Sequence, residues 1–300
     1  MSTLESAIVD TPASRAVLHN PQNFFKYSLS PVARHQFVHE RDMAFAHQGA
    51  PTEIELSTAD VLGTPYPATT PLLLARYLCI GSQESLRVNR LTSGEVLYVL
   101  RGEGVSSDGA DVIRWGVGDV FSFPGGTEVI HEAKTRTILF SVCNEPLLRF
   151  ERLQAPSPGS AAVRPVHWTR DTIESSLQDI YARTNGDEAS GRAVQLSSGD
   201  MAPAMHTLPS MNVAINTLQA GGDQRPHRHN GVAITLAVKG EGVHSMIEDQ
   251  RVDWLDGAAQ ITPATELHSH HNRGGERMYS LVVQDEGLHF YTRTPGFSWT

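Results

Sequence analysis

The sequence is poor in cysteine and has no long apolar run. Its two cysteines, Cys79 and Cys143, cannot form a disulfide framework, and both lie in apolar segments, LLLARYLCI and TILFSVCN. We interpret them as small core residues in a reducing compartment. No run approaches the ~18 apolar residues that a membrane-spanning helix needs, and the N-terminus lacks the pattern of a secretory signal. We therefore expect a cytoplasmic protein with no membrane partner.

Positive charge is also in short supply. The chain has 24 Lys and Arg against 33 Asp and Glu, which gives a formal net charge of −9. This balance argues against nucleic acid or an anionic membrane as the main partner. Hydrophobic residues make up 40% and charged residues 19% of the 300 residues, as in a globular protein of one large or two medium-sized domains.

Composition shifts along the chain predict four segments. Residues 1–70 form an N-terminal arm and extension, 71–153 a strand-rich block, 154–185 a linker and helix, and 186–300 a second strand-rich block. The helix is expected to begin at Asp171 as N-cap, with Glu174 three residues on, and to bury a stripe that includes Ile173 and Leu177.

The two strand-rich blocks repeat each other. GEVLYVLRGEGV in the first corresponds to GVAITLAVKGEGV in the second, and WGVGDVFSFP corresponds to WLDGAAQITP. Gly102 aligns with Gly240, and Pro124 aligns with Pro263. Such a repeat indicates two copies of one β unit.

Two motifs in the second copy make the repeat unit resemble the cupin. GGDQRPHRHNGVAITLAVKG places His227 and His229 at an HxH, and GAAQITPATELHSHHN places His268 at the histidine of the second cupin motif. The resemblance implies an all-β fold of two tandem cupin (jelly-roll β-barrel) domains with a short inter-domain helix. It also implies that these three histidines bind one metal ion.

Physical chemistry agrees with this ligand set. Residues i and i+2 of a strand face the same side, so His227 and His229 point together into the barrel. An HxH pair alone is often two surface or hydrogen-bonded histidines, but the third histidine favours a metal site. Neutral imidazoles suit Fe, Zn, Cu and Ni, and three protein ligands leave coordination positions open.

The glutamate of the first cupin motif is replaced by Ala233 in the second copy. Three neutral ligands leave the metal charge uncompensated, which favours an anionic, chelating substrate. The first copy keeps Glu95 but has Asn89, Leu91 and Val129 at the ligand places. We expect the first copy to be a metal-free structural partner.

Within the cupins, the chain most resembles the gentisate 1,2-dioxygenases, through PHRHN, HSHHN and the segment VHWTRDTIESSL. That resemblance implies Fe(II), with Mn, Ni or Zn as alternatives, and cleavage of the ring of a hydroxybenzoate by dioxygen. His270 matches a second pocket histidine of the family and is the candidate catalytic residue. In that family the iron generally lies in the first cupin, and an arginine holds the substrate where this chain has Thr235.

The predicted function is that of an Fe(II)-dependent extradiol-type dioxygenase acting on gentisate or a substituted salicylate. The alternatives are a cupin isomerase, lyase or hydrolase that uses the metal as a Lewis acid, and a non-catalytic small-molecule-binding bicupin. Exposed sheet edges favour a homodimer or homotetramer. Candidate substrate-binding residues, each also compatible with a surface or strand-edge role, are Arg225, Arg277, Asn216, His244 and Thr235.

Overall fold

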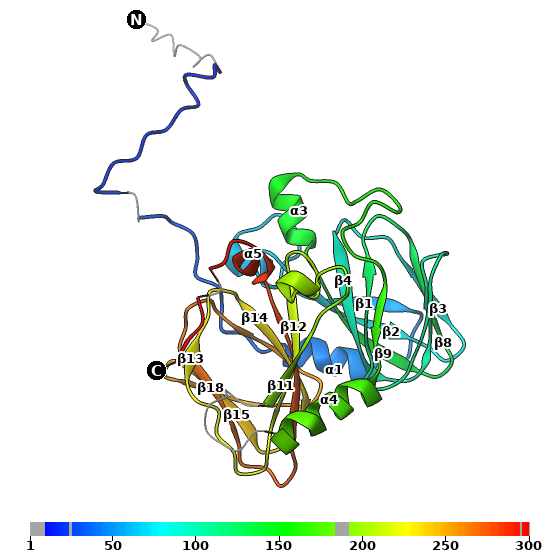
Figure 1. The fold of residues 1–300 in the computed structure, drawn as a ribbon. Coiled ribbons are helices and arrows are strands. Elements are labelled where there is room, and N and C mark those ends of the chain that lie inside the picture. Colours follow the sequence, from blue (N-terminus) through cyan, green and yellow to red (C-terminus); the bar gives the residue numbers. More distant parts are fainter. Residues whose placement is uncertain (1–9, 24–25, 184–191, 295, 300) are drawn as a thin grey trace, which may run out of the picture. The chain divides into compact units, whose positions relative to one another are not determined.

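The computed structural model describes residues 10–23, 26–183, 192–294 and 296–299. The chain divides into two units, Met1–Pro31 and Val32–Thr300. Among the described residues of the first unit, four large apolar side chains are exposed, namely Val17, Leu18, Tyr27 and Leu29. The second unit contains every helix and strand named below and both copies of the repeat (Figure 1).

The first copy consists of two antiparallel sheets. The larger has the order β1-β2-β9-β4-β7-β10 and the smaller β3-β8-β5-β6. The strands are β1 (Thr52–Leu56), β2 (Leu74–Ile80), β3 (Ser85–Val88), β4 (Gly94–Arg101), β5 (Gly104–Ser107), β6 (Val112–Trp115), β7 (Val120–Pro124), β8 (Val129–Ala133), β9 (Thr137–Cys143) and β10 (Val166–Trp168).

The second copy repeats this arrangement, with a larger sheet β11-β12-β19-β14-β17 and a smaller sheet β16-β15-β18-β13-β20. The strands are β11 (Arg192–Leu196), β12 (Asn212–Leu218), β13 (His227–Arg228), β14 (Ala233–Lys239), β15 (Val243–Ile247), β16 (Gln250–Asp253), β17 (Ala259–Thr262), β18 (His268–Asn272), β19 (Met278–Gln284) and β20 (Ser298–Trp299).

The strand orders confirm the predicted all-β fold of two tandem units. The run β2-β9-β4-β7 corresponds to β12-β19-β14-β17, and β3-β8-β5-β6 corresponds to β13-β18-β15-β16. Among the described residues the strands of each copy form two separate sheets and no closed hydrogen-bonded barrel.

The larger sheets carry the core. Every residue of β2 and β9 is buried, which explains why these strands are nearly continuous apolar runs and do not alternate. Tyr77 and Phe140 pack with ring centroids 5.7 Å apart, and both belong to a core cluster that extends into the second copy through Ile215 and Leu281. Burying one large apolar side chain contributes roughly 1.5–3 kcal/mol, so this shared core joins the two copies.

The helices are few and short: α1 (Val38–Ala46), α2 (Ala59–Leu62), α3 (Glu145–Glu151), α4 (Arg170–Arg183), α5 (Gly287–Tyr291) and the 3-10 turn η1 (Ala202–Ala204). Helix α4 is the predicted inter-domain helix, and it buries Ile173 and Leu177 as expected. Its predicted N-cap is wrong by two residues. The hydroxyl of Thr169 accepts a hydrogen bond from the backbone N–H of Thr172 at 3.2 Å, so Thr169 caps the helix and Asp171 lies in its first turn.

The segment before β1 connects the two copies. The backbone N–H of Phe37 donates to Ala259 in β17 at 2.8 Å, and the N–H of Ile261 donates to His35 at 2.9 Å. Helix α1 follows and also packs on β1 and β2 of the first copy, between the two halves in Figure 1. Strand β1, from the predicted extension, and β10, from the predicted linker, both belong to the large sheet of the first copy.

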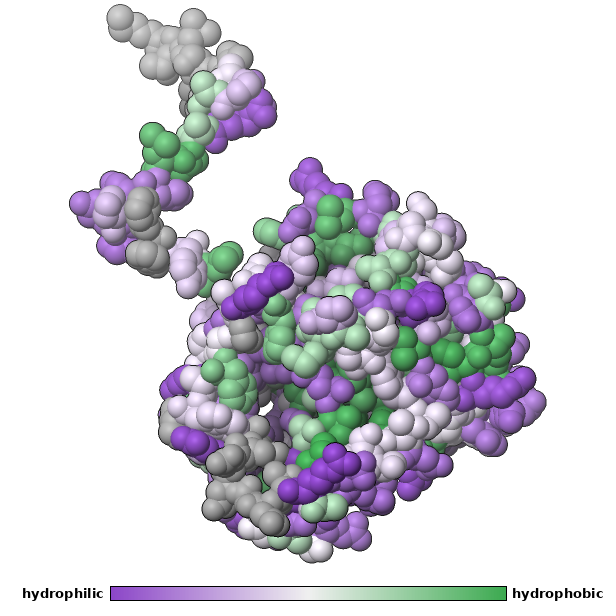
Figure 2. All heavy atoms as spheres, in the orientation of Figure 1, coloured by the Kyte–Doolittle hydropathy of each residue, from purple (hydrophilic) through white to green (hydrophobic). Residues whose placement is uncertain are grey.

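Polar and apolar side chains are mixed over the face of the second unit that Figure 2 presents. Of the helices within the described residues, none is long and apolar enough to cross a membrane.

Candidate metal centre

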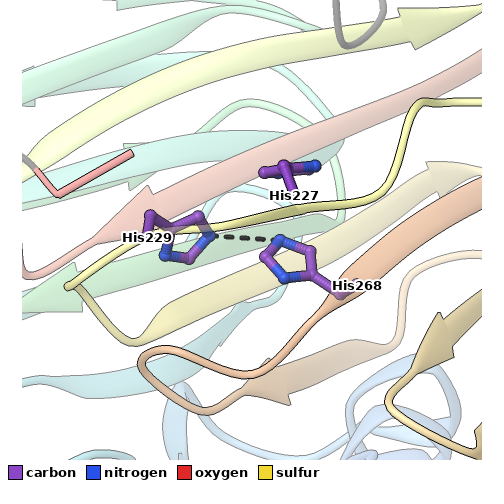
Figure 3. A group of neighbouring side chains, drawn as sticks. All are labelled: His227, His229 and His268. Atoms are coloured by element: carbon purple, nitrogen blue, oxygen red, sulfur yellow. Dashed lines mark hydrogen bonds between the residues drawn. The ribbon is translucent and has the colours of Figure 1, made fainter. Parts of the chain in front are cut away.

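Strands β13 and β18 bring the three predicted ligands together. His227 and His268 are direct partners in the antiparallel register, and His229 follows two residues after His227. The three rings turn toward one another (Figure 3), and one ring nitrogen from each lies within 4.8 Å of the others. The Nε2 atoms of His229 and His268 are 3.1 Å apart.

Backbone carbonyl groups fix the orientation of all three rings. Each Nδ1 lies 2.8–3.2 Å from a carbonyl oxygen, which can only accept a hydrogen bond, so each ring carries its proton on Nδ1. The Nε2 lone pairs are therefore left without a proton and can bind a metal ion. The acceptors for His227, His229 and His268 are the carbonyl oxygens of Arg225, Gly231 and Glu266, respectively.

Burial keeps these rings neutral. Burial and the neighbouring imidazole of His268 lower the pKa of His227 to about 4. Burial likewise lowers the pKa of His229 and of His268 to about 4. Neutral imidazoles are the form that binds transition metals.

The donor set fits a metal ion. Because His229 and His268 both hold their protons on Nδ1, the close Nε2 atoms present two lone pairs to each other and cannot hydrogen-bond. A cation between them would remove this repulsion. Three converging imidazole nitrogens with open positions match the donor preference of Fe, Zn, Cu or Ni.

A cavity of ≈ 220 Å³ lies beside the triad. Among the described residues that line it, none is Lys or Arg, and Glu286 is the only carboxylate. Burial raises the pKa of Glu286, whose carboxylate accepts a hydrogen bond from the backbone N–H of Gly231 at 3.2 Å. The cavity is otherwise lined by hydroxyl, apolar and carboxamide groups, the last belonging to Gln195, Asn212, Asn216, Gln224 and Gln284.

His270 also lines this cavity, as the sequence predicts. It is buried, and burial lowers its pKa well below the usual range. Its Nδ1 lies 2.9 Å from the hydroxyl oxygen of Ser245. That oxygen also accepts hydrogen bonds from Trp254 Nε1 at 2.7 Å and Gln260 Nε2 at 2.6 Å.

The structure brings two of the five predicted substrate-binding residues to the cavity, Asn216 and Thr235. The side chain of His244 points to the opposite face of β15 from its neighbour Ser245, because side chains alternate along a strand, and its ring stacks on His271. The exposed side chain of Arg225 lies over Trp299, with 5.4 Å from Cζ to the ring centroid.

Arg277 lies elsewhere. It pairs with Glu174 of α4 at 2.6 Å and lines a separate cavity between the two copies, together with Tyr98 and Tyr279. Arg277 precedes β19, whereas Gln284 at the other end of that strand lines the triad cavity. Seven residues of extended chain place these ends roughly 20 Å apart.

Sequence reasoning missed Phe297 and Glu286. Phe297 stacks on His227 with ring centroids 5.1 Å apart, and Trp299 of β20 pairs in register with His227. Phe297 and Glu286 both lie outside the two cupin motifs. Glu286 lies between β19 and α5. Strand parity gives no signal for such positions.

The first copy places an ion pair where the second places its ligands. Val88 pairs with Val129 as His227 pairs with His268, so Val88 and Arg90, and not Asn89 and Leu91, occupy the HxH places. The difference arises because the loop before β4 is one residue longer than the loop before β14. The buried guanidinium of Arg90 lies 2.7 Å from Glu95 Oε1 and 2.8 Å from Glu53 Oε2.

Comparison with protein families agrees with the motifs and the geometry. Residues 214–284, which contain the triad, match the family described as Cupin domain. This segment of the chain matches a cupin domain, and the chain is similar to gentisate 1,2-dioxygenases. It is 24% identical over 137 residues to a gentisate 1,2-dioxygenase of Ralstonia sp, covering 45% of this chain and 39% of the relative. It is 34% identical over 82 residues to a 5-aminosalicylate 1,2-dioxygenase of Comamonas sp, covering 27% and 22%.

These matches span less than half the length of either curated relative. Solved structures extend the likeness in fold across most of this chain. The salicylate 1,2-dioxygenase of Pseudaminobacter salicylatoxidans has a TM-score of 0.71 at 12% identity, over 89% of this chain and 88% of the other. A mutant of that enzyme in complex with gentisate has a TM-score of 0.74 at 12% identity, over 93% and 90%.

Proposed function

We propose that this cupin protein is an Fe(II)-dependent dioxygenase that cleaves the ring of a small hydroxylated aromatic acid of the gentisate or substituted salicylate type. The observation that carries the proposal is the cluster of three neutral, buried imidazoles beside a small cavity whose described lining contains no Lys or Arg. The named activities of its curated relatives support the same reaction class.

His227, His229 and His268 would hold the metal, and their backbone hydrogen bonds keep the Nε2 atoms in place without movement. A ferrous ion held by these residues would supply a spin-allowed route between dioxygen and the aromatic substrate. The protein contributes proximity, because it holds both reactants in one enclosed volume.

The size and the charge of the site favour a substrate that is an anion with a single ring. The cavity volume of ≈ 220 Å³ lies below the usual range for drug-sized ligands. Since no described cavity residue is cationic, the charge of the substrate would be balanced by the metal, and the carboxamides and Thr235 would orient its substituents. Burial raises the pKa of Glu286, because its charged form is less stable in the cavity than in water.

The first copy serves as a metal-free partner in this proposal. Arg90 supplies a fixed positive charge to Glu95, at the place where the second copy gathers imidazoles. We further propose that the protein works as a homodimer or homotetramer, and that residues 186–300 form the catalytic cupin.

The test is oxygen uptake by anaerobically prepared Fe(II) protein mixed with gentisate, salicylate and substituted salicylates. Admission of dioxygen should give a ring-opened product, measured by absorbance and mass, in a one-to-one ratio with the oxygen consumed. If none of these acids consumes oxygen while Zn(II)-loaded protein converts one of them, the Lewis-acid alternative takes the place of ring cleavage.

A further inference from the structure

The hydrogen bonds around Ser245 determine the tautomer of His270. A serine hydroxyl has two acceptor lone pairs and one proton. Trp254 Nε1 can only donate, and it reaches the oxygen of Ser245 at 2.7 Å, while Gln260 Nε2 donates to the same oxygen at 2.6 Å. With both lone pairs used, the proton of Ser245 is left for Nδ1 of His270, which lies 2.9 Å away.

His270 is thus opposite in tautomer to the metal-site histidines. Its Nδ1 accepts a hydrogen bond, so a neutral ring must carry its proton on Nε2, whereas the triad rings carry theirs on Nδ1. His270 lines the same cavity as the triad, and its ring centroid is 6.2 Å from that of His268. Of the four histidines that line the cavity, three therefore present a nitrogen lone pair and one presents an N–H donor.

We infer that Ser245, Trp254 and Gln260 are positioning residues that hold His270 as an Nε2–H donor to an oxygen anion of the substrate in the cavity. A donor fixed in this way stabilises the phenolate or carboxylate oxygen of a bound hydroxybenzoate. It cannot also take up a proton through Nε2, so hydrogen-bond donation is selected over the proton-acceptor role. The identity of the ligand, but not the tautomer, rests on the proposed function.

The first copy contains the Trp–Ser–His part of this network without the ligands, and Phe121 stands at the place of Gln260. The indole of Trp115 donates to Ser106 at 2.8 Å, and Ser106 lies 2.7 Å from Nδ1 of His131. All three side chains are buried, as in the second copy. Equivalent substitutions in the first copy therefore reproduce any effect on folding without touching the triad cavity.

The first measurement is nitrogen NMR of isotope-labelled, Zn(II)-loaded protein, with the His270 signals assigned by loss in His270→Gln. Wild type should show a proton on Nε2 and none on Nδ1. Ser245→Ala should give a mixture of both tautomers, because Nδ1 loses its donor. A wild-type ring protonated on Nδ1 would overturn the inference, whether or not the protein cleaves aromatic rings.

The second measurement is calorimetric binding of salicylate to the Zn(II)-loaded protein. Ser245→Ala and the shape-retaining Trp254→Phe should weaken binding on the order of tenfold, since a hydrogen bond to a charged group is worth about that much. Ser106→Ala and Trp115→Phe should lower the melting temperature by similar amounts and leave the affinity unchanged. If the substitutions in the first copy weakened salicylate binding as much as those in the second copy, the network would only support the fold. That result would contradict the inference.

Discussion

At the scale of single residues, the hydrogen bonds of the ring nitrogens separate metal-site histidines from their neighbours. His227, His229 and His268 use Nδ1 for backbone carbonyls, whereas His271 on the same strand uses Nδ1 for Asp223 at 2.5 Å. We predict that alanine at any of the three removes bound metal. His271→Ala, the control from β18, should retain it. Elemental analysis of the purified variants measures both, and metal retained in any triad variant would contradict the assignment.

A second residue-scale prediction concerns the ion pair in the first copy. Glu95 is buried; burial would raise the pKa of its carboxyl, but Arg90 and a hydrogen bond from Ser141 outweigh burial and lower it. Removing one partner of a buried ion pair costs about 3–5 kcal/mol. Arg90→Met should lower the free energy of unfolding by that order and leave metal content unchanged, as urea denaturation and elemental analysis would show.

The same carboxyl gives a pH dependence of known sign. A lowered pKa in the folded state means that the unfolded chain binds the proton more tightly. The ionised carboxyl therefore stabilises the folded protein fully at pH values above the unfolded pKa of about 4.3. This stabilisation is lost as the pH falls through the folded pKa. In metal-free protein, the stability difference between wild type and Glu95→Gln should therefore shrink as the pH falls below about 4. A difference that grew on acidification would contradict the ionised pair.

At the scale of elements, the sequence predicts what depends on short-range periodicity. The i, i+2 alternation predicted that His227 and His229 share one face of a strand, and the resemblance to the second cupin motif added His268 from another strand. Register between distant strands is not readable in this way. Because the loop before β4 is one residue longer, the first-copy positions equivalent to the ligands are Val88 and Arg90, and not the predicted Asn89 and Leu91. Arg277 lines a different cavity from the triad, and parity could not show this because it does not give position along a strand.

The C-terminal strand β20 is an element that no motif predicted, and it covers the triad. Phe297 lines the cavity and stacks on His227, with its side chain partly exposed. Aromatic pairs contribute about 0.5–1.5 kcal/mol beyond their buried area. We predict that Phe297→Ala weakens salicylate binding up to about tenfold, and that Phe297→Leu weakens it less, with metal content unchanged in both. Calorimetry on Zn(II)-loaded protein tests this, and loss of metal from Phe297→Ala would assign the residue to the metal site instead.

At the scale of the whole molecule, two similar β units carry different side chains at corresponding places, and we propose that their roles differ accordingly. Both retain the buried Ser–Trp–His network, but the first holds an arginine–glutamate pair and the second a cluster of imidazoles. The repeat predicted the two units, and the shared core through Phe140 and Ile215 explains why a unit without ligands is retained as packing surface. This division of roles is the central claim about the molecule.

The most direct test of that claim is anomalous X-ray scattering at the iron absorption edge, recorded from crystals of the Fe(II)-loaded protein. We predict one peak per chain, within bonding distance of Nε2 of His227, His229 and His268, and none near Glu95. A peak in the first copy, or the absence of any peak between the three imidazoles in protein that elemental analysis shows to contain iron, would contradict the account.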